Sequence, residues 1–259
     1  MSEKKPFEKK PLPDDLFTLY GRQSVLEALK DESILPYKLH LADSNRTGGT
    51  LADIMQIAEK KQIPLAWHSR LELSRISRNG KQDQGIALDI RVPSLQKASL
   101  LHAQAKSRNM RLLALDQITN PQNVGMILRS AAAGELDGVI IPRRGCARLD
   151  ALVIKASAGT FFRTPIFACD TLPELLEKLQ QEANTEICLM EASAQQSLFA
   201  HKAKSSVIYV LGNETEGVSA AIQKIPHTAL SIAMANGVES LNVAMTATLI
   251  AYRNKLCST

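Results

Sequence analysis

Two spacings of hydrophobic residues alternate along the first part of the chain. Segments 21–31 and 51–63 carry apolar residues at helical spacing, whereas segments 37–42 and 86–92 alternate apolar and polar positions. Helical spacing is typical of amphipathic helices, and strict alternation is typical of half-buried strands. The pattern therefore predicts a small α/β domain over residues 16–93.

The second part of the chain has continuous apolar runs, as expected for parallel strands buried on both faces. Such strands are expected at 111–116, 137–142, 164–168, 186–191, 206–212 and 228–234. Segments with apolar residues at helical spacing lie between several of these strands and after the last one, at 123–134, 149–159, 172–182 and 241–255. This alternation predicts an α/β domain over residues 109–259, with a parallel sheet covered by helices on both faces. The segment 94–108 is interpreted as a polar or weakly helical linker.

Cysteine and histidine spacing argues against a disulfide framework and against a metal site. Four cysteines stand far apart, and the five histidines are scattered as well: the cysteines are Cys146, Cys169, Cys188 and Cys257. Since none forms a CxxC pair, we expect no metal and interpret the thiols as reduced and mostly buried.

Charge permits a nucleic-acid partner without requiring one. The net charge is +5 and the pI is about 9.0, so a polyanion such as RNA could bind, whereas an aromatic content of 4% disfavours a base-stacking platform. Residues 1–15 are rich in Lys and Pro and predict a disordered basic tail. Neither a signal peptide nor a membrane-spanning run is apparent, which predicts a cytoplasmic protein.

Three polar segments follow predicted strands, at the edge where open parallel sheets bind ligands. In the first, Asn123 is expected to cap the following helix, and Arg129 to lean back toward the strand end from nearly two turns inside that helix. Taken alone, these residues fit a capped helix with one exposed arginine equally well.

The other two segments are weaker signals when each is taken alone. The second, residues 212–217, has glycine at both ends but lacks the Gly-Lys-Ser/Thr of a P-loop and the GxGxxG of a dinucleotide site, so an ordinary turn is the simpler interpretation. The third places Glu239, Ser240 and Asn242 at the start of the last helix, where one capping residue would suffice.

In this order, the three segments resemble the signature motifs of the SpoU (TrmH) branch of the SPOUT methyltransferases. They are similar to Asn123-x-Gly125-x-x-x-Arg129, Leu211-Gly212-Asn213-Glu214-x-x-Gly217, and Ile232-x-Met234 followed by Ser240-Leu241-Asn242-Val243. The resemblance covers residues 110–259. "LYGRQSVLEAL" and "QGIALDI" resemble the N-terminal substrate-binding domain of the family more weakly.

The resemblance implies an S-adenosylmethionine-dependent RNA ribose 2′-O-methyltransferase that works as a homodimer and whose sheet domain is a deep trefoil knot. The most similar subgroup methylates a guanosine of 23S ribosomal RNA, with an N-terminal RNA-binding domain like small ribosomal proteins. The chain departs from the usual family pattern at two positions. Ala233 stands in the cofactor loop where the family often has Pro, and Asp83 stands where the family commonly has the His of a His-Gln-Gly motif, which bears on RNA specificity.

The resemblance also implies which motif residues form the site, and their positions predict a role for several of them. The catalytic candidates are Asn123, Arg129, Glu214, Ser240 and Asn242. The cofactor-binding candidates are Leu211, Gly212, Asn213, Gly217, Ile232, Met234 and Leu241. Asn123 and Asn242 would orient the ribose or brace Arg129, Glu214 would pair with Arg129, and Ser240 would bond Arg129 or the substrate.

Arg129 is the residue whose chemical role is least settled by the motifs. The methyl donor is already activated, so the protein must mainly align donor and acceptor and stabilise the oxygen that loses its proton. Because a guanidinium stays protonated, Arg129 fits a clamp on the RNA phosphate better than a general base. The proton would then pass to a phosphate oxygen, or to Glu214 through water.

Other functions remain open from the sequence. One keeps the chemistry and changes the substrate, as a tRNA ribose 2′-O-methyltransferase. Another is a non-catalytic RNA-binding ribosome-assembly factor, which the complete set of polar motif residues disfavours. A nucleotide-dependent oxidoreductase is disfavoured by the missing GxGxxG after the first buried strand.

Overall fold

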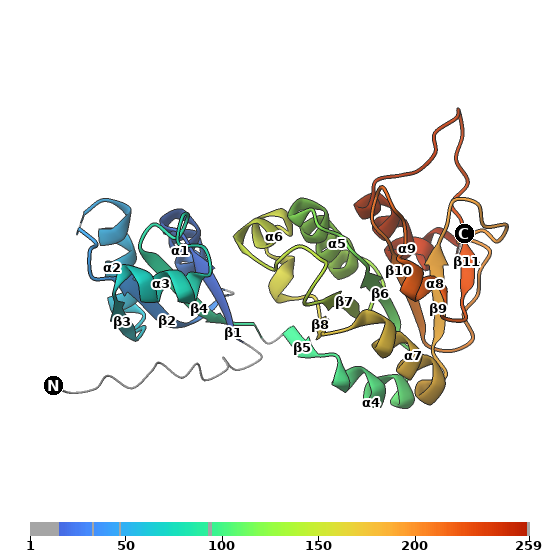
Figure 1. Ribbon diagram of the computed structural model, residues 1–259, viewed down its shortest axis with the longest axis horizontal. Coiled ribbons are helices and arrows are strands. Elements are labelled where there is room, and N and C mark those ends of the chain that lie inside the picture. Colours follow the sequence, from blue (N-terminus) through green and yellow to red (C-terminus); the bar gives the residue numbers. More distant parts are fainter. Residues whose placement is uncertain (1–15, 33, 47, 93–94, 258–259) are drawn as a thin grey trace. The chain divides into compact units, whose positions relative to one another are not determined.

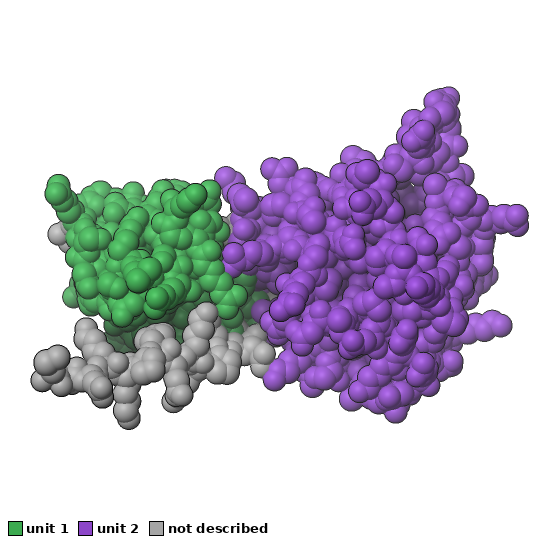
Figure 2. Space-filling model, viewed as in Figure 1, with its two compact units in different colours: residues 1–30, 34–92 green, residues 31–33, 93–259 purple. Residues whose placement is uncertain are grey.

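The computed structural model describes residues 16–32, 34–46, 48–92 and 95–257, so the predicted tail at 1–15 lies outside the described residues. The chain divides into two compact units, residues 1–30 with 34–92 and residues 31–33 with 93–259 (Figure 2). Among the described residues, none of the helices combines the length and the apolar character needed to cross a bilayer.

Unit 1 is built on a four-stranded mixed sheet with the order β1-β4-β2-β3. The β1–β4 and β4–β2 pairs are antiparallel, and β2 pairs with β3 in parallel. The strands are β1 (Leu16–Tyr20), β2 (Leu35–Ala42), β3 (Leu65–His68) and β4 (Ile86–Arg91). Its helices are α1 (Arg22–Lys30), α2 (Thr50–Lys60) and α3 (Arg70–Ser77). The alternating segments of the sequence thus form β2 and β4, and both helical segments form helices.

Unit 2 contains a seven-stranded sheet in which every pair is parallel, with the order β11-β9-β10-β6-β7-β8-β5. Its strands are β5 (Leu95–Lys97), β6 (Arg111–Leu115), β7 (Gly138–Pro142), β8 (Ile166–Cys169), β9 (Glu186–Met190), β10 (Val207–Leu211) and β11 (Thr228–Leu230). The α/β class with a parallel sheet and a smaller N-terminal α/β unit is therefore confirmed. The trefoil knot stays a prediction.

Helices cover both faces of this sheet (Figure 1). They are α4 (Ser99–Ser107), α5 (Pro121–Ala133), α6 (Ala151–Ala156), α7 (Leu172–Ala183), α8 (Ala220–Gln223) and α9 (Val243–Cys257), and a 3₁₀ turn lies at Thr160–Phe162. One core cluster joins apolar residues of α4, α7 and α8 to alternate residues of the strands. On the opposite face α5 packs against both α6 and α9. Gly134 brings the end of α5 close to α9, because a Cβ there would lie 2.7 Å from the Ala251 carbonyl oxygen.

The structure differs from the expected linker at 94–108. Residues 95–97 form β5, which pairs with β8 at the edge of the sheet, and α4 follows. Leu101 is fully buried and α4 packs against α7. The segment reads as polar because only one narrow side of α4 is apolar, and that side is enough to hold it on the sheet.

The strand order reverses direction at β6. From β6 the chain continues to β7 and β8 on one side, whereas β10, β9 and β11 lie on the other side. In open parallel sheets, such a reversal leaves a crevice outside the carboxyl ends of the central strands, where ligands bind. Here the central pair is β6 and β10, and both lead into polar motif segments.

Candidate active site

The loops after β6 and β10 are held together at the carboxyl edge of the sheet. Leu115 and Leu211 end the two strands in register. The Asp116 backbone amide then donates to the Leu211 carbonyl oxygen at 2.8 Å, and its carboxylate accepts a hydrogen bond from the Ser219 amide at 2.6 Å. Asp116 is buried, so this carboxylate fixes one loop on the other from inside. The sequence motifs did not identify Asp116, although a lone Asp directly after a buried strand is a recognisable signal.

Asn120, rather than Asn123, caps α5. The Asn120 side-chain oxygen accepts a hydrogen bond from the Gln122 amide at 2.9 Å, and Pro121 occupies the first helical position. The prediction that Asn123 caps this helix is therefore wrong. Proline suits the first turn because it has no amide hydrogen to satisfy, so the helix begins one residue after Asn120. This earlier start leaves the Asn123 side chain available for other partners.

Asn123 links all three motif segments through its side-chain amide. Its nitrogen donates a hydrogen bond to the Glu214 carboxylate, and its oxygen accepts one from the Asn242 side chain at 3.2 Å. Asn123 is 5% exposed, whereas Glu214 and Asn242 lie at the surface. We call this chain of contacts the Asn–Asn–Glu relay. It brings three of the five catalytic candidates together at the carboxyl edge of the sheet.

Asn242 also starts α9. Its side-chain oxygen accepts a hydrogen bond from the Ala244 amide at 2.9 Å, the contact expected of a capping residue. Its side-chain nitrogen is therefore the group that reaches Asn123. Since the cap is satisfied by Asn242, Ser240 has no such task, and it is exposed without a hydrogen-bond partner among the described residues.

The turn after β10 needs glycine at its first position. Asn213 and Gly217 exchange two backbone hydrogen bonds of 2.9 Å, which closes the turn. A Cβ on Gly212 would lie only 2.2 Å from the Gly217 carbonyl carbon, so no other residue fits there. The Asn213 side-chain oxygen accepts from the Thr215 amide at 2.8 Å, and its nitrogen donates to the Gln117 carbonyl oxygen at 3.1 Å. This turn positions Glu214 for its bond to Asn123.

Arg129 lies outside the relay. It follows Asn123 by six positions on α5, which places it about 120° around the helix and about 9 Å along it. The side chain is exposed and makes no hydrogen bond or ion pair with the described residues. The expected pairing of Glu214 with Arg129 is not present in the single chain, where Glu214 bonds Asn123 instead. Ser130, on the next position, faces α9 and bonds Thr248.

The segment between β11 and α9 carries the remaining cofactor-binding candidates. It starts at the β11 edge of the sheet, projects from the unit (Figure 1) and returns to Asn242 beside Asn123. Ile232, Met234 and Leu241 have partly buried side chains there. Their backbone amides donate no hydrogen bond to the described residues. Unpaired backbone donors beside apolar side chains are what a flat heteroaromatic ring requires.

A thiol lies directly behind the site. The Cys146 sulfur donates to the Leu115 carbonyl oxygen at 3.4 Å. Burial raises the pKa of this thiol to about 11, so it is protonated near neutral pH. Because the thiolate is the nucleophilic form of cysteine, Cys146 does not supply a nucleophile. The described residues at this edge are thus suited to positioning rather than to covalent catalysis.

Unit 1 has a basic pocket of its own. A pocket of about 640 Å³ is lined by polar and cationic side chains, and the cationic ones are Arg22, Arg46 and Arg70. Gln84 accepts a hydrogen bond from the Arg22 amide at 2.9 Å, and Asn45 donates to the Gly85 carbonyl oxygen at 2.7 Å. Three guanidinium groups beside amides suit phosphate and base edges. No sequence pattern indicated this pocket.

Asp83 has an internal role in the pocket wall. Its carboxylate is 1% exposed and accepts from the Gly85 amide and the Ser77 hydroxyl, each at 2.9 Å. This residue stands where the resembling family commonly has His. Its side chain therefore shapes the Gln84 turn from within and does not face a ligand.

Comparison with family models agrees with both units. Residues 110–252 match the SpoU rRNA Methylase family, and residues 18–96 match the RNA 2'-O ribose methyltransferase substrate binding family. A relative from Mycolicibacterium vanbaalenii, named "Uncharacterized tRNA/rRNA methyltransferase", is 33% identical over 239 residues, covering 92% of this chain and 75% of the relative.

Two solved structures resemble the fold. The SpoU methyltransferase AviRb from Streptomyces viridochromogenes, in complex with the cofactor AdoMet, has a TM-score of 0.63 at 18% identity, covering 92% of this chain and 89% of AviRb. A structure concerning 2-OH methylation of C/U34 on tRNA has a TM-score of 0.51 at 24% identity. That match covers 58% of this chain and 97% of the other protein.

Proposed function

The chain belongs to the SpoU rRNA methylase family and is an RNA methyltransferase, and on that basis we propose that it transfers the methyl group of S-adenosylmethionine to a ribose 2′-hydroxyl of RNA. The observation that carries the proposal is the Asn–Asn–Glu relay, which joins all three motif segments at the reversal of strand order. The family match of unit 1 to a 2′-O-ribose methyltransferase substrate-binding domain supports the same position of methylation.

The proposed substrate is a guanosine of 23S ribosomal RNA. Unit 1 supports a large RNA, because it supplies a second binding surface whose pocket holds three arginines. The tRNA-related structure matches only 58% of this chain, so the rest of the chain has no counterpart in that match. A tRNA substrate is the second candidate, favoured by the name "tRNA/rRNA methyltransferase" of the M. vanbaalenii relative.

S-adenosylmethionine fits the segment between β11 and α9 and the turn after β10. Ile232, Met234 and Leu241 offer apolar surface and unpaired backbone amides to adenine, and the turn after β10 lies at the carboxyl edge of the sheet. The AdoMet-bound AviRb structure of the same fold supports this assignment. When bound, the cofactor supplies a methyl group on a positively charged sulfur.

Within the relay, the catalytic task of this chain is alignment. Asn123 is held from both sides, so its amide has a single orientation, and it fixes the Glu214 carboxylate at the mouth of the site. Held this way, Glu214 takes the hydroxyl proton through a water molecule, or orients the ribose while a phosphate oxygen takes it. Ser240, exposed beside Asn242, is free to bond the ribose.

Arg129 acts as a clamp on the RNA phosphate next to the reacting ribose. Its exposed guanidinium has no partner among the described residues, so it is available to an anion. A permanently charged group near the developing oxyanion lowers the barrier without giving up a proton. Because Arg129 lies outside the relay of its own chain, the active assembly pairs it with the relay of a second copy.

This arrangement requires the homodimer that the sequence resemblance implied. Both helices that carry relay residues expose large apolar side chains, Met126 on α5 at 41% and Met245 on α9 at 60%. Apolar side chains next to functional residues favour an interface between copies. The dimer, and a cytoplasmic location, belong to the same proposal.

The deciding experiment maps ribose methylation across ribosomal RNA and tRNA from cells with and without the protein. Purified protein is then given labelled S-adenosylmethionine and each RNA separately. We expect one ribose-methylated guanosine of 23S RNA to disappear without the protein. Methylation of tRNA alone would select the second candidate, and absence of S-adenosylmethionine binding in calorimetry would favour a ribosome-assembly factor.

A further inference from the structure

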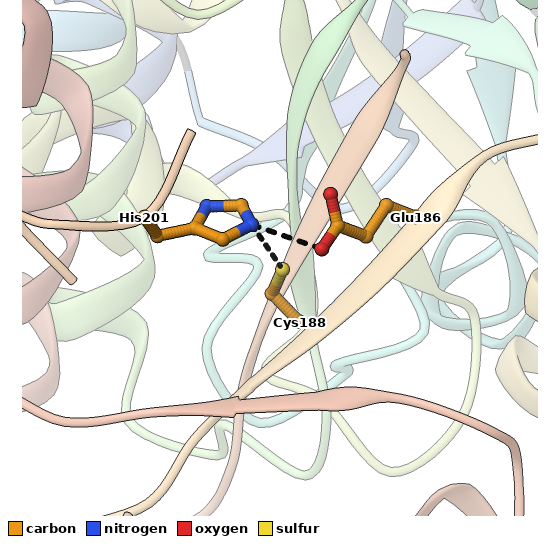
Figure 3. A group of neighbouring side chains, drawn as sticks. All are labelled: Glu186, Cys188 and His201. Carbon is orange, nitrogen blue, oxygen red and sulfur yellow. Dashed lines mark hydrogen bonds and ion pairs between the residues drawn. The ribbon is translucent and has the colours of Figure 1, made fainter. Parts of the chain in front are cut away.

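Three side chains with metal-ligating atoms converge at the amino end of β9, at the sheet edge opposite the candidate active site. Glu186 opens β9, and Cys188 lies two residues later on the same side of the strand. His201 comes from the segment 191–206, which connects β9 to β10. Figure 3 shows the three side chains pointing toward one another.

The spacing of their ligand atoms suits one ion. The His201 Nε2 atom lies 2.9 Å from the Glu186 Oε1 atom and 3.9 Å from the Cys188 sulfur, and all three ligand atoms lie within 4.8 Å of one another. Tetrahedral zinc bond lengths separate such atoms by roughly 3.4–3.6 Å. Changes of roughly 1 Å or less in the separations of these atoms would therefore bring all three to bonding distance.

Burial and charge also suit a divalent ion. Cys188 is fully buried and the His201 side chain is 4% exposed, whereas the Glu186 side chain is 28% exposed. Glu186 and His201 line a pocket of about 620 Å³, so an ion can enter and keep a water as its fourth ligand. A carboxylate and a thiolate together cancel the charge of a divalent ion, which is the condition for holding it in a largely buried place.

Several buried polar atoms beside the cluster also have no partner. The His201 Nδ1, Thr185 Oγ1 and Tyr209 hydroxyl atoms are buried and have no hydrogen-bond partner among the described residues. The rings of His201 and Tyr209 meet edge to face with their centroids 6.2 Å apart, and Thr185 lines the same pocket as Glu186. Buried polar atoms without partners are rare in folded proteins. Because the His201 Nδ1 atom points away from the Nε2 atom that faces Glu186 and Cys188, these atoms indicate a water molecule beside the cluster and not the ion itself.

The same residues have two simpler interpretations. One is a cysteine nucleophile activated by His201, but the thiol is buried beside a carboxylate, which disfavours a thiolate nucleophile. The other is a His201–Glu186 hydrogen bond beside an inert thiol. That interpretation leaves the convergence of the Cys188 sulfur on the same two groups unexplained.

We propose that Glu186, Cys188 and His201 bind one divalent ion of the zinc class. A ligand set of one thiolate, one imidazole and one carboxylate favours zinc over magnesium or calcium, which prefer oxygen ligands only. Binding displaces the thiol proton of Cys188 to solvent, since the thiolate is the ligand form. The ion ties segment 191–206 to β9 and acts on stability, because it lies at the opposite edge of the sheet from the relay.

Metal content and thermal stability test the site in the full chain. Protein stripped with a chelator is titrated with zinc chloride, followed by elemental analysis after desalting. We expect one zinc per chain, and a rise of about 5–10 °C in melting temperature when free zinc is about 100 times Kd. The proposal is overturned if zinc stays below one equivalent and the melting temperature does not rise.

Cobalt reports the ligands directly. With cobalt chloride in place of zinc, thiolate ligation gives an absorption band in the near ultraviolet, which we expect in the unaltered protein. The band should vanish in Cys188→Ala and persist in Cys169→Ala, which removes another buried thiol of unit 2. The band should also persist in Glu191→Gln, since Glu191 faces His227 at 3.6 Å and not the proposed site. Absence of the band in the unaltered protein, or its persistence in Cys188→Ala, contradicts the proposal even if a variant folds poorly.

Discussion

The side-chain amide of Asn123 donates a hydrogen bond to the Glu214 carboxylate, although 91 residues separate the two along the chain. Asn242, a further 28 residues beyond Glu214, holds the same Asn123 amide from the other side. Three motifs that are individually weak therefore meet in one buried amide. The two hydrogen bonds of Asn123 fix the position of the Glu214 carboxylate at the mouth of the site. A substitution at Asn123 can remove both bonds without unfolding the chain.

Replacing Asn123 by Ala should lower kcat by about 100-fold, because Glu214 loses its anchor and a small misplacement at a site of this kind costs that much. The measurement is single-turnover methyl transfer to RNA. Asn120→Ala is the matched control: it removes the cap of α5, costs about 1 kcal/mol of stability and leaves the relay in place. Equal losses of activity in the two variants would show that the relay has no catalytic role.

Replacing Arg129 by Ala should leave the free energy of unfolding within about 0.5 kcal/mol, since the side chain is exposed and makes no hydrogen bond or ion pair with the described residues. The rate of transfer should fall about 100-fold to 1,000-fold if Arg129 stabilises the developing oxyanion. The pH–rate profile of Arg129→Lys distinguishes clamp from base. A retained profile with a lower rate supports the clamp, whereas loss of the basic limb would assign proton removal to Arg129.

The double variant Arg46→Ala, Arg70→Ala should weaken RNA binding by unit 1 and reduce the slope of log K against log salt by about 2, because each arginine removed leaves one phosphate without its cation. The Michaelis constant for RNA should rise while kcat is retained. Arg75→Ala serves as control, because Arg75 is an exposed arginine of α3 outside the pocket. The same fall in salt dependence in the control would mean that general surface charge, not the pocket, binds RNA.

Met245→Glu should convert a dimer into a monomer, because a charge in the first turn of α9 would have to be buried between copies. Light scattering after size exclusion gives the mass directly. Leu100→Glu provides the comparison: Leu100 is 50% exposed on α4, on the other face of the sheet, and its variant should remain dimeric. If the unaltered protein is already a monomer at working concentration, the dimer and the partner role of Arg129 are both refuted.

Alkaline pH should destabilise unit 2 through its buried thiols. Burial raises the pKa of Cys146 and of Cys169 from 9.0 to about 11, so the folded state binds more protons than the unfolded state between these values. The free energy of unfolding should therefore be unaffected by these groups below about pH 9, and should fall as pH rises from about 9 to about 11. Urea unfolding across that range checks this. Removing both thiols by alanine should reduce the fall but not abolish it, because burial also raises the pKa of Cys188. Cys257→Ala should leave the fall unchanged, since Cys257 is exposed.

Most of the sheet framework could be predicted from the sequence, because continuous apolar runs and helical spacing mark buried strands and covering helices. Helices that contact the sheet through few apolar residues could not be predicted in this way. α4 presents Leu101 and Ala105 to the sheet from an otherwise polar segment, and α3 exposes Leu71, so its apolar side is hard to recognise. In both helices, tertiary packing decides the structure more than local composition.

Residues of the site could be predicted from the sequence only where the residue type restricts the place that it can take in a helix, strand or turn. Asn120 and Asn123 both suit the start of α5, and Pro121 decides in favour of Asn120, a local preference that the sequence already contained. The direction of Arg129 depends on where α5 starts and on what lies opposite its exposed side, which one chain does not define. The cluster of Glu186, Cys188 and His201 has no metal-motif spacing, since two ligands lie two apart and the third 13 residues later.

Asn242 both caps α9 and holds the Asn123 side chain, so it determines when during synthesis the enzyme becomes competent. The ribosome synthesises Asn123 first, Glu214 next and Asn242 last, and α9 can begin only after Asn242 has emerged. A product terminated before this residue lacks α9 and one of the two contacts that hold the Asn123 amide, so premature termination yields inactive protein rather than a weakened enzyme. Methylation is thereby reserved for chains whose translation has passed the start of α9.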